Sequence, residues 1–124
     1  MATKVVDRVT NTIQTTDVNP QFPISYTLPA GSTGAYTATI VAREPATDDS
    51  AGYILRGVWK RPAAGNAAVP GGGALVVDSA VREDQAAWDA TCVLATFALQ
   101  IQVTGENAKT IEWYCVLDVV YYTP

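Results

Sequence analysis

The chain has 124 residues, a formal net charge of −4 at neutral pH and no histidine. A domain of this length can bury roughly two-thirds of the surface that its unfolded chain exposes. Hydrophobic residues make up 48% of the chain and charged residues only 16%, so a disordered chain is not expected. The only basic cluster, Arg56, Lys60 and Arg61, is too small to form a nucleic-acid-binding face.

The N-terminus and the cysteines bear on the compartment. Residues 1–7 contain no apolar run of a signal peptide, and no window approaches the ~20 apolar residues that span a bilayer. We therefore expect synthesis in the cytoplasm and no membrane partner. Cys92 and Cys115 could form a disulfide if their strands were neighbours, but two buried free thiols are the favoured interpretation.

Short strands separated by turn-forming residues are predicted along the chain. Their expected ranges, in order, are 4–9, 24–28, 35–43, 52–60, 74–78, 88–94, 96–103 and 110–122. Between them, residues 61–73 contain two prolines and three consecutive glycines and indicate a long loop. Residues 79–87 fit either a short helix capped by Ser79 or a strand and loop, and the second is favoured. Residues 88–103 could also form one strand bent near Ala95.

The first 23 residues predict an extended arm, and residues 24–124 predict the folded domain. Prolines at positions 20 and 23 disfavour helix for the residues that precede them. The arm carries apolar residues among threonine and asparagine, and it could add a strand to the sheet edge of a neighbouring subunit. Its candidate contact residues are Val5, Val6, Val9 and Ile13.

Residues 97–122 predict a long C-terminal hairpin. Apolar residues alternate through 97–103, Gly105 and Asn107 lie where the chain must reverse, and alternation resumes after Thr110. One face of the last strand carries the residues expected in the core: Ile111, Trp113, Cys115, Leu117, Val119 and Tyr121. Together with the other strands, this hairpin predicts an all-β fold, namely an antiparallel, jelly-roll-like β-sandwich.

The opposite face of the last strand is also apolar, with Tyr114, Val116, Val120 and Tyr122. A second apolar face must be covered, either by another sheet of the same subunit or by another subunit. We expect a homo-oligomer, with three copies as the expected number.

The residues favour no catalytic or metal chemistry. Without histidine, the commonest general base and zinc ligand is missing, so no catalytic, cofactor or metal site and no enzyme activity are predicted. Paired carboxylates at 48–49 and 83–84 could serve a glycosidase, but solvated loop charge is the favoured interpretation. A carbohydrate-binding module would need Tyr53, Trp59 and Tyr114 in an exposed row.

Two stretches resemble a module that recurs in structural proteins of tailed bacteriophages. They are Ala87-Trp-Asp-Ala-Thr91 and the segment from Leu99 through Val103-Thr-Gly-Glu106 and Lys109-Thr-Ile111 to Trp113. The module has a tryptophan strand, a strand ending in V-T-G-E, a turn ending in K-T-I, and a second tryptophan two residues later. Residues 4–16 resemble the start of small virion proteins more loosely.

This resemblance implies a non-enzymatic virion structural protein on the capsid surface or tail. Because the chain reads as one module without a stalk, we expect a capsid decoration (cement) protein that bridges capsomers. Its partners would be the major capsid protein or other virion proteins. A tail-fibre or receptor-binding module is the alternative within phage proteins, and a carbohydrate-binding module is the alternative from another class.

Overall fold

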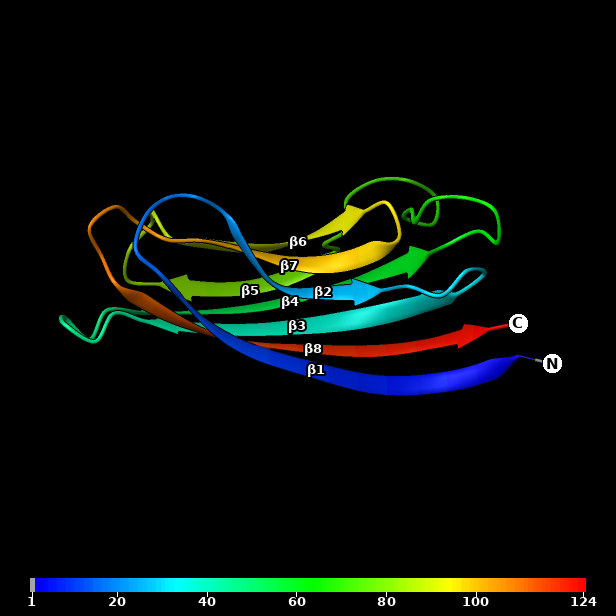
Figure 1. Ribbon diagram of the computed structural model, residues 1–124, viewed down its shortest axis with the longest axis horizontal. Coiled ribbons are helices and arrows are strands. Elements are labelled where there is room, and N and C mark those ends of the chain that lie inside the picture. Colours follow the sequence, from blue (N-terminus) through cyan, green and yellow to red (C-terminus); the bar gives the residue numbers. More distant parts are fainter. Residues whose placement is uncertain (1) are drawn as a thin grey trace.

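The computed structural model describes residues 2–124, which form two antiparallel sheets packed face to face (Figure 1). The strands are β1 (Thr3–Thr15), β2 (Gln21–Thr27), β3 (Thr33–Arg43), β4 (Ser50–Lys60), β5 (Asp78–Glu83), β6 (Asp89–Ala95), β7 (Ala98–Thr104) and β8 (Ile111–Thr123). One sheet has the order β1-β8-β3-β4-β5 and the other β2-β7-β6. The predicted all-β sandwich is confirmed. Within the described range, no helix could span a membrane.

The core lies between the two sheets and is centred on Trp113. This side chain is fully buried, its indole N–H donates to Thr15 Oγ1 at 2.9 Å, and its ring lies 6.3 Å from those of Tyr53 and Trp88, between centroids. Leu99, the first core residue of β7, is also fully buried. The inner face predicted for the last strand is therefore confirmed from Ile111 to Val119, and Tyr121 is half-buried.

The predicted C-terminal hairpin is wrong, because β7 and β8 lie in different sheets. β7 pairs with β2 and β6, whereas β8 pairs with β1 and β3. Residues 105–110 carry the chain from one layer to the other, as the orange loop in Figure 1 shows. Two strands that face each other across a core have the same alternation as two strands that pair, so the pattern could not separate these arrangements.

The predicted arm is also different in the structure. β1 pairs with β8 along its whole length, from Thr3 opposite Thr123 to Thr15 opposite Ile111. It is therefore an edge strand of its own sheet, and the expected boundary at residue 23 falls inside β2. Pro23 lies where the pairing of β2 with β7 shifts register, a position that tolerates a residue without an N–H donor.

Two other segments differ from their predicted ranges. The fifth strand begins at Asp78, where a strand was expected to end, and the favoured prediction of a strand and loop over residues 79–87 is confirmed. All six residues of β5 are exposed, so no alternation marked its start. Residues 88–103 form two paired strands and not one bent strand. They reverse at Thr96, which takes a positive φ of 50° that a β-branched residue rarely adopts.

The two cysteines lie in opposite sheets, Cys92 in β6 and Cys115 in β8, and both are free and buried. The favoured interpretation of two buried thiols is confirmed. Burial raises the pKa of each thiol to about 12.

Candidate functional site

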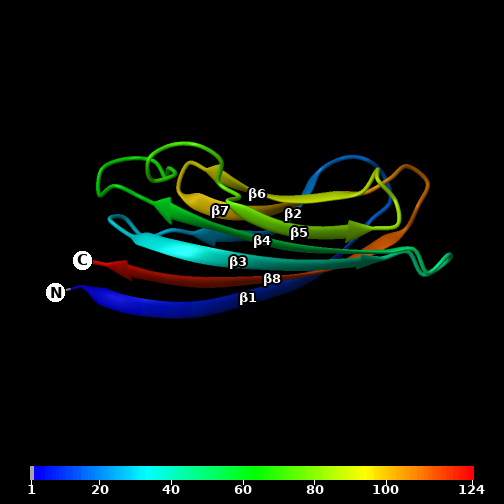
Figure 2. The ribbon, with the colours of Figure 1, turned by 180° about the vertical axis from the view of Figure 1, so that it is seen from behind.

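The outer face of the five-stranded sheet is the most unusual surface of the molecule. Neither ribbon view shows a strand on the outer side of this sheet (Figures 1 and 2), and Pro70 of the β4–β5 loop borders it beside Val58. Because paired residues in an antiparallel sheet point to the same side, the strand registers place the outward side chains in rows that cross the sheet.

Six rows cross this surface, and each runs from β1 toward β5. One of them, at the far end from Lys4, is polar throughout: Gln14, Glu112, Arg43 and Ser50. The end row is Lys4, Tyr122, Thr33 and Lys60. The valine row is Val6, Val120, Ala35 and Val58. The charged row is Arg8, Asp118, Thr37, Arg56 and Asp78. The threonine row is Thr10, Val116, Thr39, Ile54 and Ala80. The tyrosine row is Thr12, Tyr114, Val41, Gly52 and Arg82.

Large apolar side chains are exposed on both sides of the charged row. Val6 is 83% exposed, Val120 50% and Tyr122 53%. A shallow, mainly apolar hollow of about 710 Å³ lies across the end row and the valine row. Contiguous apolar surface of this kind on a globular domain marks a binding site more often than a solvated face.

The charged row separates the apolar rows and is internally paired. Arg8 Nε lies 2.6 Å from Asp118 Oδ1, and Arg56 Nη1 lies 3.3 Å from Asp78 Oδ2. The hydrogen bond to Asp118 raises the pKa of the Arg8 guanidinium. Ion pairs this exposed contribute little to folding stability. The order of their charges along the row therefore acts mainly on which partner surface can bind to this face.

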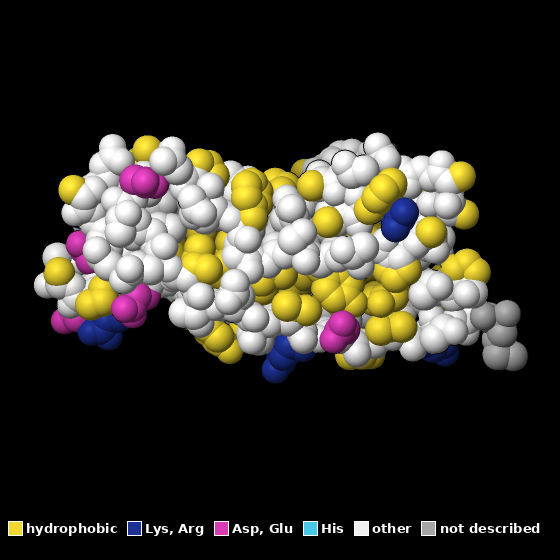
Figure 3. All heavy atoms as spheres, in the orientation of Figure 1, with side chains coloured by type: hydrophobic (Ala, Val, Ile, Leu, Met, Phe, Trp, Pro, Cys, Tyr) yellow, Lys and Arg dark blue, Asp and Glu magenta, His cyan; other side chains and the backbone are white. Residues whose placement is uncertain are grey.

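The structure brings together five of the eight predicted contact residues and separates three. Val6, Tyr114, Val116, Val120 and Tyr122 share the outer face. By contrast, Val5, Val9 and Ile13 lie at the inward positions of β1, which alternate with Val6 and the other outward residues, and they are half-buried. Val9 and Ile13 pack against the buried core. Figure 3 shows hydrophobic side chains gathered along the side of the molecule.

Sequence reasoning missed the contribution of β3 and β4 to this face. Val41, Ile54 and Val58 are exposed there and extend the surface beyond β8. Their signal was present in the sequence, because the outward positions of two strongly alternating strands carry valine and isoleucine where polar residues would be expected.

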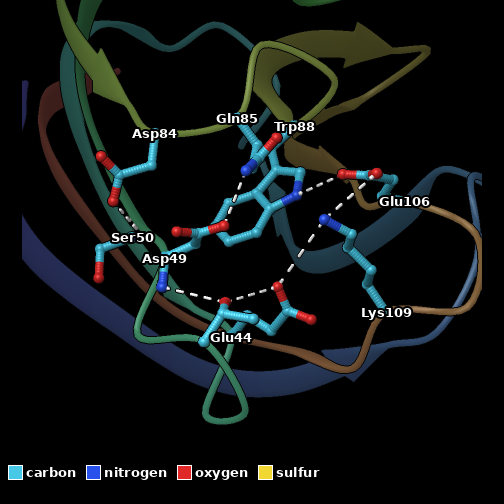
Figure 4. Close-up of polar contacts among 9 residues, drawn as sticks. Glu44, Asp49, Ser50, Asp84, Gln85, Trp88, Glu106 and Lys109 are labelled. Carbon is cyan, nitrogen blue, oxygen red and sulfur yellow. Dashed lines mark hydrogen bonds and ion pairs between the residues drawn. The ribbon is translucent and has the colours of Figure 1, made fainter.

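The second polar feature is a cluster of charged side chains at one end of the sandwich (Figure 4). Glu44 is buried and accepts a hydrogen bond from Thr47 Oγ1 at 2.9 Å. Lys109 Nζ lies 4.0 Å from Glu44 Oε1 and 3.5 Å from Glu106 Oε2. Glu106 also accepts a hydrogen bond from the Trp88 indole at 3.2 Å. These contacts tie the β3–β4 loop to the β7–β8 loop.

The carboxylates considered for glycosidase chemistry are held in similar ties. Asp49 accepts a hydrogen bond from Gln85 Nε2 at 2.7 Å, and Asp84 accepts one from the Ser50 N–H at 2.9 Å. Asp48 pairs with Arg43, and Glu83 accepts a hydrogen bond from the Tyr53 hydroxyl at 2.6 Å. Among residues 2–124, no group of three or more such side chains could hold a metal ion. The geometry fits a brace between loops.

The exposed aromatic row that a carbohydrate-binding module would need does not form. Tyr53 and Trp59 are core residues with at most 1% of their surface exposed, and only Tyr114 of the three faces solvent. The reason is register, since Tyr53 and Trp59 lie on the inner face of β4 while Tyr114 lies on the outer face of β8.

No protein-family model matches the chain, and no curated protein is similar to it. Among solved structures, a tailspike protein, gp49 from Acinetobacter baumannii bacteriophage Fri1, is similar. That protein is a capsular polysaccharide depolymerase. The similarity covers 96% of this chain and 17% of the tailspike chain, at 13% identity and a TM-score of 0.42. Similarity this distant does not bear on the function of the present chain.

Proposed function

We propose that this chain is a non-enzymatic structural protein of a bacteriophage virion, and specifically a capsid decoration protein that bridges capsomers. The observation that carries the proposal is the uncovered outer face of the five-stranded sheet, where apolar rows border a charged row. The resemblance of residues 87–113 to a phage module supplies the assignment to a virion. The partners would be the major capsid protein or other virion proteins.

The architecture suits a protein that strengthens an assembly by adding contacts. Burial of apolar surface contributes roughly 25 cal/mol per Å². A preformed sheet loses less conformational entropy on binding than a flexible loop would. The outer face of the three-stranded sheet is different, since Ser25, Thr27, Gln100 and Gln102 make it polar. One side of the sandwich is therefore suited to protein contact and the other to solvent.

A position in the tail is the second candidate, because the resembled module also occurs in tail-fibre proteins. A head position and a tail position would use the same outer face of the chain. Only the location of the protein on the particle separates them. We keep a homo-oligomer as part of the proposal, since the outer face of β8 has no cover within its own subunit.

The proposal is tested on purified particles of the phage that encodes the chain. Mass spectrometry of the particles should detect it, and a cryo-electron microscopy map should place the sandwich on the outer head surface between capsomers. Density in the tail would support the second candidate instead. Absence from the purified particle would contradict any virion role.

A further inference from the structure

We infer that the occupant of the outer face is a second copy of this chain, packed face to face about a two-fold axis parallel to β3. The inference rests on the proposed function only in taking this face as a protein-binding surface. It then names the partner from the order of charges and sizes across the sheet.

The charged row is complementary to itself under this symmetry. Read from β1 to β5, its charges are positive, negative, neutral, positive and negative. A two-fold axis along the central strand places β1 opposite β5 of the second copy and β8 opposite β4. Arg8 then faces Asp78 of the second copy, and Asp118 faces Arg56. Every charge of the row meets its opposite, which is the pattern that favours one orientation of association.

The strand on the axis is suited to meeting its own copy. Residues on a two-fold axis face themselves, so a charge there would be repelled. The central outward residues of β3 are Ala35, Thr37, Thr39 and Val41, which are uncharged and of small or moderate size. Arg43, at the end of this strand, is paired with Asp48 of the adjoining loop. Two copies can therefore approach closely along β3.

The flanking rows match in size as well. In the valine row Val120 would face Val58, and in the threonine row Val116 would face Ile54. In the tyrosine row the large Tyr114 would face Gly52, where a Cβ would meet nothing within 4 Å. Apolar residues thus meet apolar residues, and the bulkiest ring meets the smallest residue.

A two-fold axis perpendicular to β3, along the charged row, is opposed by the same residues. An axis along the charged row would place Arg8 on Arg8 and Asp118 on Asp118, and like charges in contact oppose association. With the favoured axis, facing twisted sheets cross at about 30°. This crossing shifts the outermost strands by about 5 Å, a distance that an arginine side chain can span.

The size of the face fits a stable pair. Five strands about 4.8 Å apart and some ten residues of about 3.4 Å each give a face of about 19 Å by 34 Å. Two such faces would bury on the order of 1,300 Å², within the range of about 1,200–2,000 Å² for stable interfaces. The pair would leave the polar faces of both three-stranded sheets exposed on its two opposite sides.

Charge reversal tests the inference without changing net charge or the ion pairs within each subunit. The first double variant is Arg8→Asp with Asp118→Arg, which inverts the β1–β8 pair. The second is Arg56→Asp with Asp78→Arg, which inverts the β4–β5 pair. In a pair of either variant alone, all four contacts join like charges. When the variants are mixed, every contact across the interface again joins opposite charges.

We expect sedimentation velocity to show the wild-type protein at twice the chain mass of 13.1 kDa. Each double variant alone should dissociate with at least a roughly tenfold higher dissociation constant, and an equimolar mixture should regain the dimer as a heterodimer. A monomeric wild type, a trimer, or a dimer that both reversals leave intact would overturn the inference. A monomer that is still found in virions would overturn the inference and the proposed homo-oligomer, and would leave the proposed virion role standing.

Zero-length cross-linking gives a second measurement that needs no charge reversal. In the Arg56→Lys variant, a carbodiimide can join the new amine to a carboxylate in direct contact. We expect a covalent dimer whose linked peptides connect position 56 to Asp118, residues that lie on non-adjacent strands of one subunit. A covalent dimer without this link, or no dimer, would contradict the two-fold arrangement.

Discussion

Both faces of β8 carry large apolar residues, although only the outer face also carries charges, Glu112 and Asp118, and the two faces have opposite surroundings. On the inner face, Trp113, Cys115 and Leu117 are fully buried under the three-stranded sheet. On the outer face, Tyr114 and Val120 are about half exposed and nothing in the described chain covers them. Alternation therefore identifies the two faces of a strand but does not say which of them the same subunit covers.

The difference separates residues that hold the fold from residues available to a partner. Changes on the inner face should act on the free energy of unfolding, and changes on the outer face should act on association. Substitutions at neighbouring positions of one strand can therefore distinguish the two roles, because they share sequence context and secondary structure.

The largest effect is expected from Trp113→Ala. Removing this side chain leaves a cavity beside Tyr53 and Trp88 and deletes the hydrogen bond to Thr15. We expect a loss of about 3–5 kcal/mol in the free energy of unfolding, measured by urea denaturation. Trp113→Phe is the matched control and should lose less, since it keeps most of the packing. A loss below about 1 kcal/mol for the alanine variant would show that the inner face is not the core.

A smaller effect is expected from a matched pair of threonine substitutions. Val119→Thr places a hydroxyl in the core, where Val119 is 1% exposed, and should cost about 1–3 kcal/mol. Val120→Thr places the same group on the outer face and should change the stability of the monomer by less than about 0.5 kcal/mol. Thermal unfolding at low protein concentration compares them. Equal losses would show that both faces are covered within one subunit.

The smallest expected change in the free energy of unfolding comes from the thiols of Cys92 and Cys115, because it arises only at alkaline pH. Unfolded thiols ionise near pH 9, whereas the folded thiols keep their protons to about pH 12. The folded state therefore binds more protons in this interval, and the free energy of unfolding should fall as pH rises above about 9. Buried Tyr36 and Tyr53, whose pKa values are also raised, act in the same direction.

Urea denaturation at pH 8 and pH 10 measures this fall. A Cys115→Ala variant should show a shallower decrease between the two pH values, because one of the linked protons is removed. Stability that stays level or rises over this interval would contradict the burial of these groups.

The sequence allowed prediction of the fold class and of the inner faces of the strands. Residues such as Trp113, Leu99 and Tyr53 alternate with period two, and that period depends only on local backbone geometry. The pairing of strands could not be read in the same way. β7 and β8 are consecutive and both amphipathic, yet they lie in different sheets. The sequence of β1 suggested an arm because most of its residues are polar. An edge strand packs only part of its surface, so most of its side chains are exposed.

The candidate face was predicted in part for the same physical reason. The outward residues of β8 were recognised because β8 is apolar on both sides. The rows that join Val120 to Val58, or Asp118 to Arg56, depend on the registers of three strands that are distant in sequence. The order of charges across the sheet is therefore visible only once the strands are aligned.

The most direct test of the central claim is the mass of three proteins across a concentration series in sedimentation equilibrium. They are the wild type, Val120→Asp on the outer face of the five-stranded sheet, and Thr27→Asp on the outer face of the three-stranded sheet. The wild type and Thr27→Asp should approach twice the 13.1 kDa chain mass, and Val120→Asp should remain near the single mass. A wild type that stays monomeric, or a Val120→Asp variant that associates as well as Thr27→Asp, would contradict the account.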